Sequence, residues 1–162
     1  MNGKLYNAAA VLSDEQLHQD KGAFFKSVFG TLNHLAVADL LWLQRMADHP
    51  AGFASLQGVL SLPKPSSLDA PICPGLPALT ELRATLDDAL QAFCAELTTE
   101  HLAQPLAYTS TKGQQGRKQL GDVLLHLFNH QAHHRGQVTT LYSQLGIDVG
   151  ATDLILLMPN VP

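Results

Sequence analysis

One segment, residues 124–137, constrains the fold more than any other part of the sequence. It reads LLHLFNHQAHHRGQ and holds four of the eight histidines within nine residues. Its apolar residues and its lack of proline favour a helix. At about 100° per residue, the four histidines and Gln137 fall within an arc roughly 100° wide. One helical face is therefore rich in imidazole, supplied by His126, His130, His133 and His134.

This face has the chemistry of a metal site. Neutral imidazole is the commonest metal ligand in proteins, and helical residues four apart have Cβ atoms about 5–6 Å apart. His130 and His134 could therefore bind one ion together. The spacing leaves alternatives open, because His126 with His130 repeats the step of four and His130 with His133 gives a step of three. Purely structural histidines are the competing interpretation. Gly136, inside the helix, suggests the close approach of a neighbouring backbone or ligand.

Length, composition and charge limit the class of protein to which this chain can belong. With 162 residues, 46% of them hydrophobic and 15% charged, the sequence predicts one globular domain over 1–162. The net charge of −4, with ten Lys plus Arg in no basic cluster, argues against a nucleic-acid partner. No apolar run reaches the ~18–20 residues of a membrane span, and no signal-peptide core follows Met1. We expect no membrane association and a cytoplasmic location.

Apolar periodicity predicts the helices. The clearest stripe covers 79–97, with Arg83 among the charged residues of the opposite face. Residues 13–16 have the form of a capping box for a second segment. The other helices are expected over 3–12, 19–47 and 117–145, the last ending before Gly146.

Proline and glycine interrupt the helices. The proline-rich stretch 48–76 should hold at most a helical turn near 53–60, and a small hairpin is expected around Lys112 and Gly113. We therefore predict an all-α fold: an up-and-down four-helix bundle with a long proline-rich crossover loop and a small hairpin before the last helix. Cys94 is expected to be a small buried hydrophobe. The apolar tail 154–158 should pack on the bundle or serve self-association.

Two regions resemble the DinB-like family of metal-binding helical bundles. Residues 5–43, from LYNAA through SVFGTLNHL to the Trp42-Leu43 pair, look like the family's first histidine helix, and 125–137 look like its signature helix. The resemblance implies a homodimer of four-helix bundles, with a divalent ion held by His34, His130 and His134. His34 taken alone reads as a core residue. Members of the family usually carry a further helical stretch before the Leu-Tyr segment, so we expect either a short first helix or a truncated start.

Residues near the three histidines and the chemistry of a bound ion complete the prediction. Supporting or pocket roles are expected for five residues: His126, His133, Gln137, Asn33 and Asp39. Three nitrogens leave a fourth position for water or substrate. Water activation would lead to hydrolysis, for which Asp39, Asp122 and Glu100 are candidate bases, whereas thiolate stabilisation would lead to thiol transfer.

Relatives of the family are associated with thiol transfer that uses low-molecular-weight thiols. We therefore expect a metal-dependent thiol transferase or hydrolase that acts on small molecules in stress or detoxification. Imidazole suits several metals, and zinc or nickel is expected here, with a low-molecular-weight thiol as a second cofactor. The alternative is a non-catalytic metal-binding protein that works through stress responses or partners.

Overall fold

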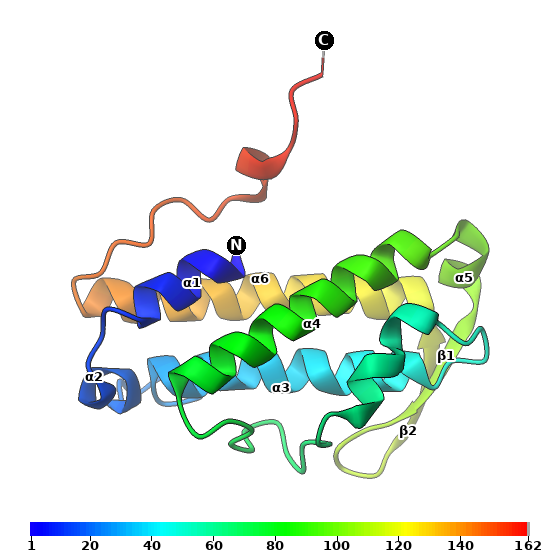
Figure 1. The fold of residues 1–162 in the computed structure, drawn as a ribbon, viewed down its shortest axis with the longest axis horizontal. Helices are drawn as coiled ribbons and strands as arrows, with labels where there is room; N and C mark the ends of the chain where they lie inside the picture. Colours follow the sequence, from blue (N-terminus) through cyan, green and yellow to red (C-terminus); the bar gives the residue numbers. More distant parts are fainter. Residues whose placement is uncertain (162) are drawn as a thin grey trace.

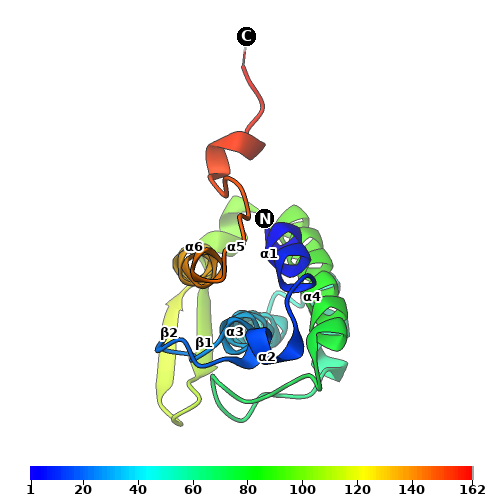
Figure 2. The ribbon, with the colours of Figure 1, turned by 90° about the vertical axis from the view of Figure 1, so that its left-hand side faces the viewer.

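The fold is mostly helical, with one small sheet. The computed structural model describes residues 1–161. Four helices surround a common apolar core, as the end-on view in Figure 2 shows. They are α1 (Asn2–Ala9), α3 (Val28–Ala47), α4 (Leu76–Glu96) and α6 (Leu120–Gln144). The predicted helical fold is thus confirmed, and no helix in the described chain combines the length and hydrophobicity needed to cross a membrane.

Shorter elements connect these helices (Figure 1). They are α2 (Asp14–His18), the 3-10 helix η1 (Ala54–Ser61), α5 (Thr99–Ala103), strands β1 (Pro105–Thr109) and β2 (Gln115–Gln119), and the 3-10 helix η2 (Leu154–Leu157). The predicted capping box is present, because Ser13 and Gln16 bond reciprocally at the start of α2. The hairpin is also confirmed, with Tyr108 opposite Gly116 in an antiparallel register. Helix α5 was not predicted.

Both histidine-bearing helices begin later than predicted. Residues 19–27 form turns, because the Asp20 carboxylate accepts a hydrogen bond from the Gly22 amide and Lys26 adopts a φ of +67°. The Ser27 hydroxyl then accepts from the Gly30 amide and caps α3. Helix α6 starts at Leu120 because residues 115–119 pair with β1 instead. Local polar bonding and strand pairing therefore override the apolar periodicity at both helix starts.

A buried polar network connects the four long helices. Asp39 on α3 is 1% exposed and lies 2.7 Å from the Arg83 guanidinium on α4. Arg83 also lies 3.0 Å from Asp87, whose carboxylate accepts from Asn2 on α1 at 2.9 Å. Gln131 on α6 donates to Asp39. The placement of Arg83 on the exposed face of its helix was therefore wrong, because the guanidinium turns inward to a buried carboxylate.

The end of the described chain leaves the bundle. The tail after α6 extends away from the helices in Figure 1, and the five apolar side chains from Leu154 to Met158 are each more than half exposed. The tail is therefore not packed on the bundle; its last residue, Pro162, lies outside the described residues. Cys94 is exposed, so its expected burial was wrong. It falls on the outer edge of the α4 stripe, whereas Phe93 beside it is fully buried.

Replacing Arg83 by methionine should destabilise the protein strongly. The variant leaves the Asp39 carboxylate buried without a cation, which costs about 3–5 kcal/mol of unfolding free energy. Urea unfolding followed by circular dichroism measures the loss. Asp88→Asn, on the exposed side of the same helix, should change the stability by less than about 0.5 kcal/mol. The double variant Asp39→Leu, Arg83→Met should recover most of the loss, and a double variant as unstable as Arg83→Met would contradict this account.

Candidate metal centre

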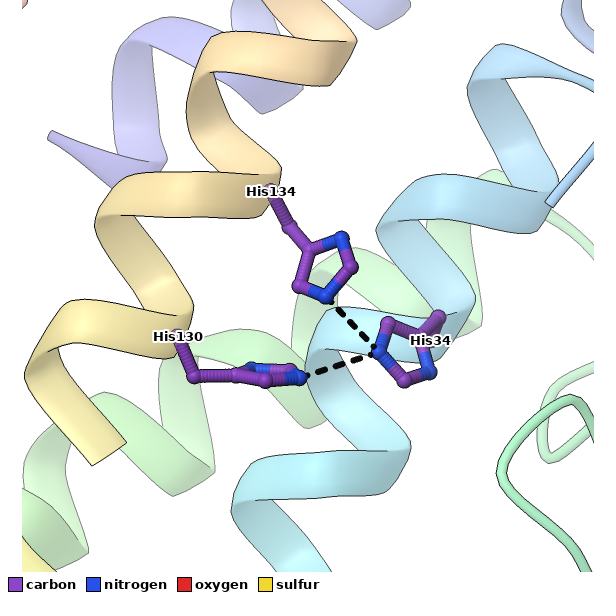
Figure 3. Close-up of side chains that lie close together, drawn as sticks. All are labelled: His34, His130 and His134. Atoms are coloured by element: carbon purple, nitrogen blue, oxygen red, sulfur yellow. Dashed lines mark hydrogen bonds between the residues drawn. The ribbon is translucent and has the colours of Figure 1, made fainter. Parts of the chain in front are cut away.

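Three histidines from two helices converge between α3 and α6. Helix α6 carries His130 and His134 one turn apart, and both rings point toward His34 on α3 (Figure 3). The Nε2 atom of His34 lies 3.1 Å from Nε2 of His130 and 3.2 Å from Nε2 of His134. The structure therefore brings together the three residues that the resemblance implied, and among the spacings left open it selects His130 with His134.

Hydrogen bonds on the far side of two rings fix which nitrogen carries the proton. His34 Nδ1 lies 2.8 Å from the Leu68 carbonyl oxygen, which can only accept, so Nδ1 is the protonated nitrogen. His134 Nδ1 lies 2.6 Å from the Gln137 side-chain oxygen and donates in the same way. Gln137 in turn donates its amide to His133 Nε2 at 3.2 Å. The Nε2 atoms of His34 and His134 consequently face each other as lone pairs.

Burial keeps the three rings neutral. It is the largest cause that lowers the pKa of His34, of His130 and of His134 below the ordinary value for histidine. The pKa of His130 falls to about 3, because the neighbouring imidazoles add to the effect of burial. Neutral imidazole is the form that binds a metal ion. At neutral pH the cluster therefore presents ligands that need no deprotonation.

The geometry fits one small divalent ion. Ligand nitrogens at ~2.0–2.1 Å from a tetrahedral ion lie roughly 3.3 Å apart. The two measured Nε2 separations, 3.1 and 3.2 Å, are close to that value. Lone pairs that face each other in a buried place repel unless a cation or proton lies between them. The donor set therefore suits a divalent ion that binds imidazole.

The proline-rich segment covers one side of the cluster. The Leu68 carbonyl of this segment accepts the hydrogen bond from His34. Next to His34, Asn33 donates its side-chain amide to the Ala70 carbonyl at 2.8 Å, and its side-chain oxygen accepts from the Ile72 amide at 3.2 Å. Two adjacent residues of α3 thus hold the loop by three hydrogen bonds. Asn33 supports the site through the backbone of this loop and not through a histidine ring.

Phe25 covers another side and was not recognised as a site residue. Its ring stacks on His34 with centroids 3.7 Å apart and meets His134 edge-on at 5.5 Å. The turn before α3 can approach so closely because Gly30 has no side chain, and a Cβ there would overlap the Phe25 carbonyl. The N-cap residue Ser27 marks Phe25 as lying outside α3, but no local pattern in the sequence indicates that its ring stacks on His34.

A cavity of about 350 Å³ opens beside His34 and His130. It lies between α3, α6 and the hairpin, and the Tyr108 ring that forms part of its wall packs across Gly116. His126 lines this cavity and takes no part in the three-histidine cluster. Trp42, Arg45, Ser110 and Thr111 also line this cavity. The cluster therefore has a space at its side large enough for a small molecule.

The remaining predicted site residues lie elsewhere. Asp39 bonds to Arg83 and Gln131, so its expected role beside the histidines is replaced by a structural one. His133 is exposed; its ring meets the His134 ring edge-on with centroids 4.8 Å apart, and its Nε2 atom accepts a hydrogen bond from Gln137. Asp122 lines a second cavity, next to His126, and Glu100 is exposed. Apart from adjacent residues and the backbone of its own helix, no described atom would come within 4 Å of a Cβ at Gly136, so the expected approach of a neighbouring backbone is not found, and the approach of a ligand stays a prediction.

Comparisons with known proteins show the family to which the chain belongs. The family model described as the DinB family matches residues 1–160. Protein DinB of Bacillus subtilis (strain 168) is 23% identical over 152 residues, which cover 94% of this chain and 84% of that protein. No solved structure matches the chain.

Fold and site together define a class: a mostly helical protein with a cluster of three histidines, suited to a metal ion, between two long helices. Because the family model spans nearly the whole chain, this protein belongs to the DinB family. The resemblance drawn from the sequence is confirmed.

Replacing Asn33 by leucine should release the proline-rich loop. The variant removes two hydrogen bonds and leaves the Ile72 amide without its acceptor, so we expect a loss of about 1–3 kcal/mol in unfolding free energy. Hydrogen exchange measured by mass spectrometry should speed up in a peptide that covers 68–73. Asn129→Leu, at an exposed position of α6, is the matched control. Equal exchange in both variants would show that Asn33 does not hold the loop.

Proposed function

We propose that this protein is a metal-dependent thiol transferase in which His34, His130 and His134 hold one divalent ion through their Nε2 atoms. The observation that carries the proposal is the convergence of three Nε2 atoms, two of which are freed for a ligand role by an Nδ1 hydrogen bond on the far side of the ring. Zinc and nickel are the ions that we propose first.

The proposed chemistry divides between the ion and the chain. When bound, a divalent ion at this position holds a thiol as its thiolate at neutral pH. Leu68 and Gln137 orient the rings of His34 and His134, and Phe25 shields these two rings from water. In the overall transfer, a carbon–sulfur bond forms on the electrophile, its leaving group departs, and the thiol proton passes to solvent.

The lining of the cavity supports thiol transfer over hydrolysis. A hydrolase would need a general base within reach of the activated water. Within the described chain, no carboxylate lines the cavity beside His34 and His130. Asp39, the candidate general base closest to His34 in the sequence, is hydrogen-bonded to Arg83. Trp42, Leu41 and Tyr108 instead offer apolar walls that suit an organic electrophile.

One further observation supports a second candidate, a non-catalytic metal-binding protein that acts through a partner. The exposed apolar tail, Leu154–Met158, is a segment that a partner would cover. In either case, we propose one domain over 1–162 with up-and-down bundle topology, a homodimer, and a cytoplasmic location.

Metal content tests the ligand set. Protein prepared without an affinity tag should contain about one divalent ion per chain by elemental analysis. His34→Ala, His130→Ala and His134→Ala should each lose it, because two nitrogens cannot replace three in a site of this kind. His126→Ala, one turn before His130 on α6, is the matched control and should keep the ion. Retention of the ion in His134→Ala would contradict the proposed ligand set.

Turnover separates the enzyme from the non-catalytic alternative. Metal-loaded protein, given low-molecular-weight thiols and chlorodinitrobenzene, should form the thioether faster than His34→Ala does. An ordinary thiol is a few per cent ionised at pH 7, so full ionisation alone predicts roughly a thirtyfold difference. Absorbance of the product measures the rate, and nitrophenyl acetate serves as the hydrolysis substrate. Metal binding without either activity would favour the partner-binding alternative, and ester cleavage alone would favour a hydrolase.

A further inference from the structure

An unpaired arginine lines the cavity beside the three histidines. Arg45 lies eleven positions after His34 on α3, which returns it to within about 20° of the same helical face. Both residues line the same 350 Å³ cavity. Arg45 forms no ion pair with a carboxylate in the part of the chain that the structure describes. Asp48, one turn further along, is exposed and borders a separate hollow with Arg45.

Aromatic rings hold the guanidinium in place. Its carbon lies 4.6 Å from the centroid of the Trp42 ring and 5.5 Å from that of Tyr108. Burial is the largest influence on the pKa of the Arg45 guanidinium and lowers this pKa. Arginine nevertheless stays charged, and a half-buried charge without a counterion is costly. Stacking orients the planar donor fork but leaves its N–H groups available to an acceptor.

A continuous aromatic wall connects this cation with the histidine cluster. The Trp42 ring lies 5.6 Å from His126, and His126 lies 5.9 Å from His130. Ala38, between His34 and Arg45 on the same face, leaves space in front of this wall. Ser110 and Thr111 of the hairpin turn add hydroxyl groups across the cavity. The cavity is therefore apolar along one side and has a cation at one end and the histidines at the other.

We propose that Arg45 binds a carboxylate of the thiol that this protein uses, while the sulfur lies at the three histidines. This inference rests on the proposed thiol-transferase function and names its substrate class: a thiol with a carboxylate remote from sulfur. One arginine carries one positive charge, which matches a carboxylate better than a dianionic phosphate, and the guanidinium fork accepts a carboxylate in bidentate fashion. The α carbons of His34 and Arg45 are about 16 Å apart along the helix axis, and the arginine side chain leans back toward His34.

Binding of thiols to the cobalt(II)-loaded protein tests this inference. The probes are ω-mercaptoalkanoates of increasing chain length, each paired with the ω-mercaptoalcohol of the same length, and the sulfur-to-cobalt absorption band reports binding. The acid should bind at least about tenfold more tightly than the alcohol at one optimal length, because only the acid forms the charged bidentate contact. Arg45→Gln should abolish this preference, and Arg45→Lys should keep part of it, since lysine offers charge without the fork.

The control separates this contact from the general charge of the protein. Arg117→Gln removes the same charge from the hairpin, where Arg117 is exposed and pairs with Ala107 on the strand face opposite Tyr108. It should leave the preference for the acid unchanged. Equal binding of acid and alcohol to the unaltered protein, or a preference that survives in Arg45→Gln, would overturn the role of Arg45. Failure to bind cobalt(II), or a cobalt site without any thiol band, would overturn the proposed function instead. Circular dichroism establishes that each variant is folded.

Discussion

The buried Asp39 carboxylate is the constraint on which the arrangement of the helices depends. It receives hydrogen bonds from Arg83 on α4 and Gln131 on α6, and Arg83 extends the network through Asp87 to Asn2 on α1. A shift of one helical turn, about 5.4 Å, would separate these groups and leave a buried charge unsatisfied. Gln131 directly follows His130, and Asp39 lies five residues after His34. The register that pairs Asp39 Oδ2 with Arg83 and Gln131 is therefore also the register that brings the three histidines together.

The histidine cluster depends in turn on segments outside the long helices. Helix pairing alone sets the positions of the rings, but the proton on His34 is directed by the Leu68 carbonyl, and one face of the ring is covered by Phe25. Both contacts come from irregular backbone, the proline-rich loop and the turn before α3. The proline-rich loop is long for a small helical fold. Its length has a reason here, because the loop supplies a hydrogen bond to His34 and is anchored beside it by Asn33.

The sequence predicted those parts of the molecule that follow from local periodicity. The arc of histidines on one helix, the capping box at Ser13 and the hairpin near Lys112 are properties of neighbouring residues, and the structure contains all three. His34 could not be identified in this way, because a single histidine on an apolar helical face looks like an ordinary core residue, and only the family resemblance singled it out. The inward orientation of Arg83 and the stacking of Phe25 on His34 depend on tertiary partners, so no local sequence pattern predicts either contact.

Different faces of helix α3 have different roles. Asp39 lies about 140° around the helix from His34 and faces the core network, whereas Arg45 shares the face of His34 and faces the cavity. Because a helix packed on its neighbours is rigid, the separation between the histidine and the arginine is fixed at three turns. Ser110 and Thr111 on the opposite wall have no such restraint, since they belong to the turn of a two-stranded hairpin whose tip is exposed. Changes at the hairpin tip should therefore alter the shape of the cavity without changing the distance between the three histidines and Arg45.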